Sequence, residues 1–237
     1  MENNICIFCR KTNVPFTSVE HIFPESIGNK KLILPKGVVC DICNNGILSK
    51  LDKVILDFEP VAFLKHFYAI PSKTGRVPDV KLPNVSMETD VDKKINLKVQ
   101  SKKFLRTKVG GFKLRITAKH QFTQKYLCCL ARAFYKIALE AIHLDHGHPI
   151  SLDKSYDLIR DKILTDKLFS GFIVFDKKCK PIPQCRIRYW FRHKDRKRYT
   201  LCELTLFGFT AYYFLEIAKP IMPELLTNHP KMNLVEF

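Results

Sequence analysis

The chain has 237 residues with a formal net charge of +17, and 46% of its side chains are hydrophobic. This composition supports a folded core and excludes a disordered or low-complexity protein. The apolar runs are shorter than the ~20 residues of a membrane-spanning helix, and no apolar leader follows Met1. The sequence therefore predicts a cytoplasmic protein that does not enter a membrane.

The first third of the chain predicts short elements followed by a connecting region. Residues 17–23 and 30–39 have strand character, and apolar side chains recur at helical spacing over residues 47–58. The expected order is strand, strand, helix. Residues 60–92 show weak periodicity and contain prolines at 71, 78 and 83, so we expect them to connect two domains.

The remainder predicts a mixed domain. Two β-prone runs, 95–99 and 112–116, are accompanied by a hairpin signal at Gly110 and Gly111. A long amphipathic helix is expected over residues 122–144. It ends in His143, Asp145, His146 and His148, for which we expect a polar helix exit, with metal binding as the alternative. A second helix is expected over residues 152–164. Four antiparallel strands are expected over residues 171–176, 185–191, 199–207 and 211–217. The fold class is therefore α+β.

Four of the nine cysteines form two pairs, Cys6 with Cys9 and Cys40 with Cys43. The other five are scattered, and an odd total without a leader argues against a disulfide framework. Two such pairs predict a closed structural Zn²⁺ site; the alternative is four reduced cysteines that only pack in a core. Simple four-cysteine ribbons have ~15–20 residues between the pairs. Here 30 residues separate Cys9 from Cys40, so the interval contains something else.

That interval carries residue types suited to phosphodiester hydrolysis. It contains Glu20-His21-Ile22-Phe23-Pro24-Glu25-Ser26, and Asn44 and Asn45 follow the second cysteine pair. Hydrolysis needs a base that activates water, and an imidazole, with an ordinary pKa of ~6.5, suits that task. A hard divalent cation takes oxygen ligands such as the Glu20 carboxylate and the Asn44 carbonyl. In a regular strand Glu20 and His21 point to opposite faces, so a bend or bulge is needed to bring them together.

With these motifs, the segment from Cys6 to about Leu51 resembles the HNH endonucleases, the ββα-metal or His-Me finger nucleases. The most similar subgroup has a zinc-binding cysteine pair on each side of the core. The resemblance covers about a fifth of the chain. It implies an HNH module with its zinc site over residues 1–59, followed by a basic α+β domain over residues 60–237.

The resemblance implies that His21 is the general base and that Glu20 and Asn44 bind one catalytic Mg²⁺ or Mn²⁺, with Asn45 as the alternative ligand. Two positions depart from the family pattern. Glu20 stands where Asp or His is frequent, and no asparagine lies near Pro35, where the family has one. Asn29 or a backbone carbonyl is expected to orient His21 instead. Taken singly, these residues also fit a strand histidine, a solvated acid and helix caps.

All of the excess charge lies in residues 60–237, which hold 33 basic and 16 acidic side chains. Such a field favours a polyanion, because side chains that neutralise phosphates release counterions; a solvated basic surface is the alternative. Three arginines share one face of a predicted strand, opposite a buried face with Tyr189 and Phe191. We expect that face and the next turn to bind nucleic-acid phosphates through Arg186, Arg188, Arg192, Lys194, Arg196, Lys197 and Arg198.

These inferences together predict a metal-dependent DNA endonuclease that hydrolyses phosphodiester bonds. Free-standing proteins of this kind suggest a role in phage defence or in a mobile element, which is an analogy with the family. One alternative is a non-catalytic, zinc-containing nucleic-acid-binding protein. Another is an RNA-directed nuclease, because a basic domain with aromatic side chains also suits single strands.

Overall fold

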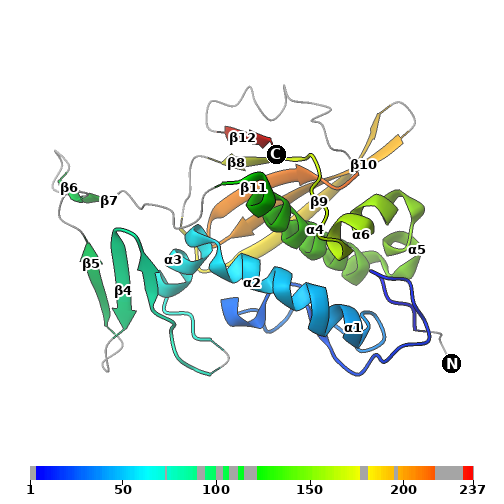
Figure 1. Cartoon of the computed structure of the whole chain (residues 1–237), viewed down its shortest axis with the longest axis horizontal. Helices are drawn as coiled ribbons and strands as arrows, with labels where there is room; N and C mark the ends of the chain where they lie inside the picture. Colours follow the sequence, from blue (N-terminus) through cyan, green and yellow to red (C-terminus); the bar gives the residue numbers. More distant parts are fainter. Residues whose placement is uncertain are drawn as a thin grey trace.

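The structure is a computed structural model with helices and antiparallel sheets, which confirms the α+β class (Figure 1). The part of the chain that it describes comprises residues 4–72, 74–89, 94–99, 104–106, 112–114, 122–176, 181–194, 197–216 and 232–236. Among these residues, no helix is both long and apolar enough to span a membrane.

The N-terminal part forms a ββα unit, in the expected order of strand, strand and helix. Strand β1 (Glu20–His21) pairs antiparallel with β2 (Ile33–Leu34). Both strands are shorter than expected, because Pro24 and the 3-10 turn η1 (Glu25–Ile27) end the first and Pro35 follows the second. The helical part consists of α1 (Asp41–Cys43), the π-helical turn η2 (Asn44–Leu48) and α2 (Ser49–Asp57).

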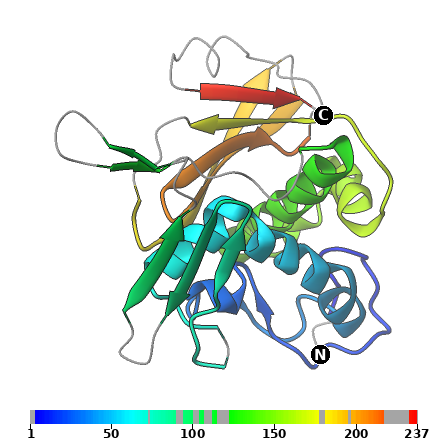
Figure 2. The ribbon, with the colours of Figure 1, turned by 60° about the vertical axis from the view of Figure 1, so that its left-hand side comes forward.

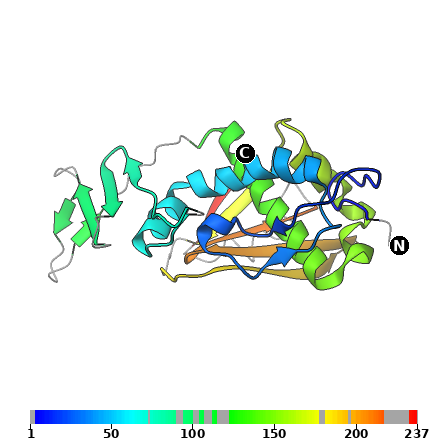
Figure 3. The same cartoon turned by 90° about the horizontal axis from the view of Figure 1, so that it is seen from below.

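The prediction that residues 60–92 only connect two domains is wrong. Helix α3 (Glu59–Phe67) begins directly after α2, with Pro60 in its first turn. Proline is favoured there because the first amides of a helix have no intrahelical acceptor, so Pro60 starts a helix. Strands β3 (Val80–Leu82), β4 (Val85–Thr89) and β5 (Ile95–Val99) then form an antiparallel sheet that extends from the main body (Figure 3).

The two β-prone runs before the long helix are both strands. The first is β5, which pairs with β4, and the second includes β7 (Phe112–Leu114), which pairs with β6 (Phe104–Arg106). Gly110 and Gly111, which carried the hairpin signal, lie outside the described residues.

Helix α4 (Gln124–His146) is the expected long helix. The side chain of Thr123 caps its first turn by accepting a hydrogen bond from the Tyr126 amide, and Gly147, with φ +68°, follows its last residue. A short helix that was not predicted, α5 (His148–Ser151), follows it. The region expected to form one further helix, residues 152–164, contains the 3-10 turn η4 (Lys154–Tyr156) and α6 (Asp157–Leu164).

A five-stranded antiparallel sheet packs on α4. The strands are β8 (Phe172–Asp176), β9 (Cys185–Lys194), β10 (Lys197–Leu206), β11 (Phe209–Phe214) and β12 (Met232–Glu236), in the order β12-β8-β11-β10-β9. The sequence predicted the first four and missed β12. Phe134 of α4 stacks on Tyr213 of β11 with ring centroids 5.7 Å apart.

Helix α4 lies between the sheet and the ββα unit, and α2 packs along it (Figures 1 and 2). One apolar core includes Cys6 and Leu51 of the ββα unit, Phe134 of α4 and Leu204 of the sheet. The ββα unit is therefore packed against a helix that lies about 70 residues further along the chain. This contact places α4 behind a pocket of the ββα unit.

The histidines after α4 form a polar helix exit. His143 is buried, with Nδ1 2.9 Å from the Ser151 hydroxyl and its ring centroid 4.8 Å from that of His148. Asp145 accepts a hydrogen bond from the Tyr189 hydroxyl at 2.7 Å. Among the described residues, these side chains form no group suited to a metal ion.

The burial of His143 predicts a pH-dependent stability. Burial, and secondarily His148, lowers the pKa of His143 from 6.5 to about 4. Between these two pKa values the unfolded chain binds more protons than the folded chain. The contribution of His143 to the free energy of unfolding is therefore fully present above pH ~6.5, and it falls by up to ~3 kcal/mol as the pH is lowered to ~4. His143→Gln is expected to remove that part of the slope of Tm against pH, whereas the exposed His193→Gln keeps it. Equal slopes for His143→Gln and the wild type would contradict this assignment.

Candidate functional site

The four N-terminal cysteines form one cluster. Their Sγ atoms all lie within 4.8 Å of one another, and those of Cys9 and Cys40 are 3.7 Å apart. Tetrahedral Zn²⁺ with bonds of ~2.3 Å requires sulfur atoms ~3.8 Å apart, so the cluster fits a structural zinc ion with four thiolate ligands. None of the four is in a disulfide.

The cluster is also prepared electrostatically for a cation. A hydrogen bond from the Cys43 thiol, helped by the backbone amide of Cys40, lowers the pKa of Cys6 to about 5. Burial raises the pKa of Cys9 to about 11. A divalent cation would allow the four thiols to ionise together in so small a volume.

Asp41 joins the cysteine cluster to the first strand. Its carboxylate accepts hydrogen bonds from the backbone amides and hydroxyls of Thr17 and Ser18, at 2.7 to 3.1 Å. These bonds lower the pKa of Asp41 to about 2. Because Asp41 lies between Cys40 and Cys43, the cysteine cluster sets the position at which the chain enters β1.

A pocket of ≈ 580 Å³ lies between β1, η1 and the helical segment of the ββα unit. His21, Asn44 and Asn45 all border it. His21 is half-buried, and its Nδ1 has no hydrogen-bond partner within the described part of the chain. The Asn44 Nδ2 donates to the carbonyl of Val19 at 2.9 Å, which leaves its Oδ1 available as an oxygen ligand.

The π-helical turn η2 begins at Asn44. Its wider backbone hydrogen bond runs from the amide of Ser49 to the carbonyl of Asn44. Such turns occur mostly as single insertions in α-helices, frequently at functional sites. Three side chains that follow one another at helical spacing border the same pocket: Asn45, Ser49 and Asp52.

Glu20 also borders the pocket, but its carboxylate forms an ion pair with a lysine of α4. The side chain is only 4% exposed, and its Oε1 lies 2.7 Å from Nζ of Lys136 on α4. The same ammonium lies 2.8 Å from Oδ1 of Asp52 and donates to the carbonyl of His21 at 3.1 Å. A cation from α4 thus connects three residues of the pocket.

A third acidic group, Glu140, completes this buried cluster. Glu140 is fully buried, and its Oε2 lies 3.4 Å from Nζ of Lys136. Burial raises the pKa values of Glu140 and Glu20, an effect that Lys136 partly offsets. Burial also disfavours the charge of Lys136, but the three carboxylates outweigh it and raise its pKa. Lys136 therefore stays protonated behind the pocket, where three carboxylates surround its single positive charge.

The role expected for Asn29 is not observed. Its Nδ2 donates to the carbonyls of Phe23 and Leu32, and its Oδ1 accepts from the amides of Lys31 and Leu32. All of these bonds close the loop between β1 and β2, so Asn29 does not orient the His21 ring.

The basic residues expected to bind nucleic acid lie on two faces of the sheet. Arg186 and Arg188 lie beside Glu203, with Nη2 to Oε1 distances of 3.4 and 2.5 Å, and the Arg188 guanidinium is 5.6 Å from the Trp190 ring centroid. Tyr189 is on the opposite face and contacts the end of α4, so the arginine face points away from the pocket.

Of the other side chains predicted to bind phosphate, Arg192 shares that face and Arg198 does not. Arg192 is exposed at the alternating position of β9, whereas Arg198 is on the helix side, where its Nη2 donates to the hydroxyl of Ser155 at 3.1 Å. Arg196 lies outside the described residues, as do the side chains of Lys194 and Lys197.

Sequence reasoning missed Lys136, Glu140 and Asp52. The first two do leave a signal, because they are charged residues within a helix that is otherwise apolar on nearly all sides. Charged groups are rarely fully buried unless they are paired, so a lysine and a glutamate four residues apart in such a helix indicate an internal ionic cluster.

Comparison with known proteins agrees with this geometry for one part of the chain. No curated protein and no solved structure matches the chain. Residues 6–57 match the family model described as HNH endonuclease, and these residues contain the cysteine cluster, the two strands and the helix that border the pocket. This match identifies residues 6–57 as similar to the HNH endonuclease family, which supports a nuclease-type function in general.

Proposed function

We propose that the protein is a metal-dependent DNA endonuclease that hydrolyses phosphodiester bonds. The observation that carries the proposal is the arrangement of His21 and Asn44 around one pocket, where neither the His21 Nδ1 nor the Asn44 Oδ1 has a hydrogen-bond partner among the described residues. The positive charge of the chain favours the polyanionic substrate.

In this proposal His21 is the general base. Its half-buried ring, next to the backbone carbonyl that Lys136 holds, accepts the proton of the attacking water. A divalent cation such as Mg²⁺ or Mn²⁺, when bound, neutralises charge that develops on the phosphate and stabilises the leaving oxygen. Asn44 supplies a neutral oxygen ligand for that cation, and Asn45, which is exposed at the rim, is the alternative.

The carboxylate ligand follows from the charge distribution of the pocket. Glu20 borders the pocket, but its carboxylate also lies 2.7 Å from the ammonium of Lys136. Asp52 borders the pocket too, and its side chain is 26% exposed. We therefore propose that Glu20 supplies the ligand predicted from sequence and that Asp52 adds a second carboxylate. This donor set of carboxylate and amide oxygens suits a hard divalent ion.

The basic domain is proposed to hold the nucleic acid, with Arg186, Arg188 and Arg192 on a face remote from the pocket. A long duplex can contact both, since affinity for nucleic acid comes mainly from phosphates spread along its backbone. Whether the host process is phage defence or transfer of a mobile element stays a prediction from the family resemblance.

Cleavage of supercoiled plasmid with Mg²⁺ or Mn²⁺ tests this function. We expect nicking by the wild type and a loss of about 10²–10⁴-fold in rate for His21→Ala, the range for removal of a general base. His146→Ala, which alters a histidine at the end of α4, is the control and should cleave normally. Equal inactivity of all three proteins in several metals, with retained binding, would favour the non-catalytic binding protein. Cleavage of RNA alone would favour the RNA-directed nuclease.

A further inference from the structure

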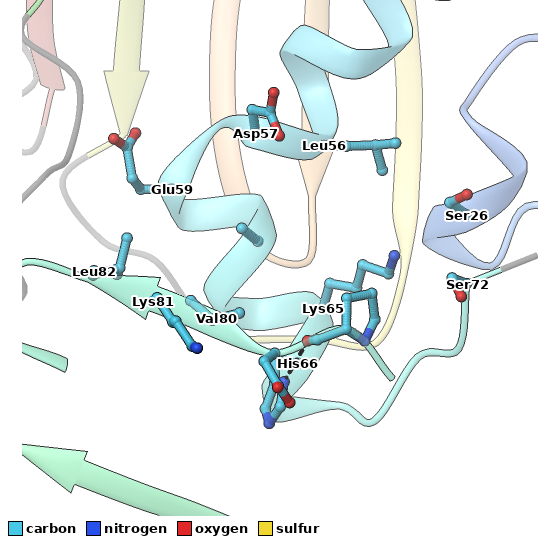
Figure 4. A pocket seen from close by; sticks show the side chains of 13 residues that line it. Ser26, Leu56, Asp57, Glu59, Lys65, His66, Ser72, Val80, Lys81 and Leu82 are labelled. Atoms are coloured by element: carbon cyan, nitrogen blue, oxygen red, sulfur yellow. Dashed lines mark hydrogen bonds between the residues drawn. The ribbon is translucent and has the colours of Figure 1, made fainter. Parts of the chain in front are cut away.

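A second cavity, of ≈ 640 Å³, adjoins the pocket of the ββα unit. The two share Ser26 and Leu56 in their walls, so a ligand can extend from one to the other. The outer wall consists of α3, the start of β3 and the segment that carries Ser72, all of which lie outside the HNH segment (Figure 4).

Lys65 of α3 is the unusual residue of this cavity. It is only 7% exposed, and it makes no side-chain hydrogen bond or ion pair with any described residue. Figure 4 shows its ammonium directed into the cavity, toward Ser26 and Ser72. Burial lowers the pKa of Lys65, and no carboxylate offsets this effect. An ammonium without a counter-ion in a cavity wall is costly, and a bound anion would remove that cost.

The acidic side chains of the cavity lie elsewhere. Figure 4 shows Asp57 and Glu59 beyond the ribbon of α3, away from the Lys65 ammonium, and Asp79 is exposed. His66 lies 2.8 Å, through Nδ1, from the carbonyl of Pro78, so its ring holds the chain before β3 against α3. The Lys65 ammonium therefore faces the part of the cavity next to Ser26, away from Asp57 and Glu59.

The wall that carries Ser26 is fixed relative to α3. Gly28 ends the turn η1 with φ +88°, a conformation that favours glycine. A Cβ atom at this position would approach Ile70 Cγ2 to 3.4 Å, because the turn packs closely on the chain that follows α3. Ser26 and Lys65 are thus held on opposite sides of the same opening.

We propose that this cavity is a subsite for a phosphate group of the nucleic-acid strand, next to the phosphate that is cleaved in the pocket of the ββα unit. Lys65 supplies the charge, and the Ser26 hydroxyl, which borders both cavities, supplies a hydrogen bond. The identity of the ligand as a nucleic-acid strand rests on the proposed function, whereas the binding of a phosphate group rests on the cavity itself.

The subsite is tested by equilibrium binding of a labelled oligonucleotide to the full chain, without a catalytic metal, at several salt concentrations. Lys65→Gln is expected to lose one phosphate contact, which lowers the slope of log K against log salt by ~0.9 for a duplex or ~0.7 for a single strand. Lys65→Arg should restore the slope. Lys81→Gln, at an exposed lysine of the same cavity, is the matched control and should change the slope less.

The folding of Lys65→Gln is measured by its Tm, which should be at least that of the wild type, because a buried unpaired charge is removed. Equal salt slopes for Lys65→Gln and the wild type would overturn the subsite. A mononucleotide that raises the Tm of the wild type and not of Lys65→Gln, with unchanged oligonucleotide slopes, would assign the cavity to a free nucleotide instead. Binding is measured without cleavage, so an inactive wild type would refute the nuclease and leave this comparison valid.

Discussion

Cys40→Ser is expected to abolish zinc binding and to unfold the ββα unit. Structural Zn²⁺ contributes about 10–16 kcal/mol of apparent binding free energy in small zinc modules, as much as the ~5–15 kcal/mol that stabilises a whole domain. Cys6, Cys40 and Cys43 belong to the same core as α4 and the sheet, so the loss extends beyond the cysteine cluster. Zinc content by elemental mass spectrometry and Tm by circular dichroism measure the two effects.

The control for that substitution is Cys129→Ser, which changes a half-buried cysteine of α4 that is not in the cluster. It should keep its zinc, and its Tm should fall by no more than a few degrees. A strong chelator should lower the Tm of the wild type and of Cys129→Ser, with little further effect on Cys40→Ser. A Cys40→Ser protein that melts like the wild type and binds one zinc ion would show that the four cysteines are not its ligands.

Lys136→Met is expected to lower the free energy of unfolding by about 3–5 kcal/mol, the usual effect of removing one partner from a buried ionic cluster. Methionine fills much of the space but leaves Glu20, Asp52 and Glu140 without their cation. Burial already raises the pKa values of Glu20 and Glu140, and loss of the ammonium raises them further. The folded variant then binds more protons than the unfolded chain, so its destabilisation grows as the pH rises.

Denaturant unfolding at several pH values measures this effect. Lys125→Met, at an exposed lysine of the same helix, should stay close to the wild type. The double variant Lys136→Met/Glu140→Gln should recover part of the loss, because it removes a buried acid along with its partner. Lys136→Met with wild-type stability at every pH would mean that the cluster does not hold the ββα unit on α4.

Much of the fold could be predicted from local patterns. The helix α4 follows from its amphipathic spacing and its Thr123 cap, and β8 to β11 follow from alternating side chains. The elements within residues 60–92 were not predicted, because the prolines and weak apolar periodicity there were interpreted as a connecting region; Pro60 lies in the first turn of α3, where proline is favourable. Strand β12 was missed because its partner, β8, is far away in sequence, and pairing over such a distance leaves no local signal.

The sequence by itself determined the four-cysteine cluster and the composition of the ββα unit, since two closely spaced cysteine pairs and the short motif between them are local features. Their chemistry depends on residue types and on spacings of a few positions. Only the tertiary structure decided what lies behind and beside the pocket. Lys136 and Lys65 are ordinary lysines in the sequence. Packing of α4 buries the first against three carboxylates, whereas the second is buried on α3 with no carboxylate partner among the described residues. The effect of a charge depends on the solvent and counter-ions around it, and these are set by contacts between segments far apart along the chain.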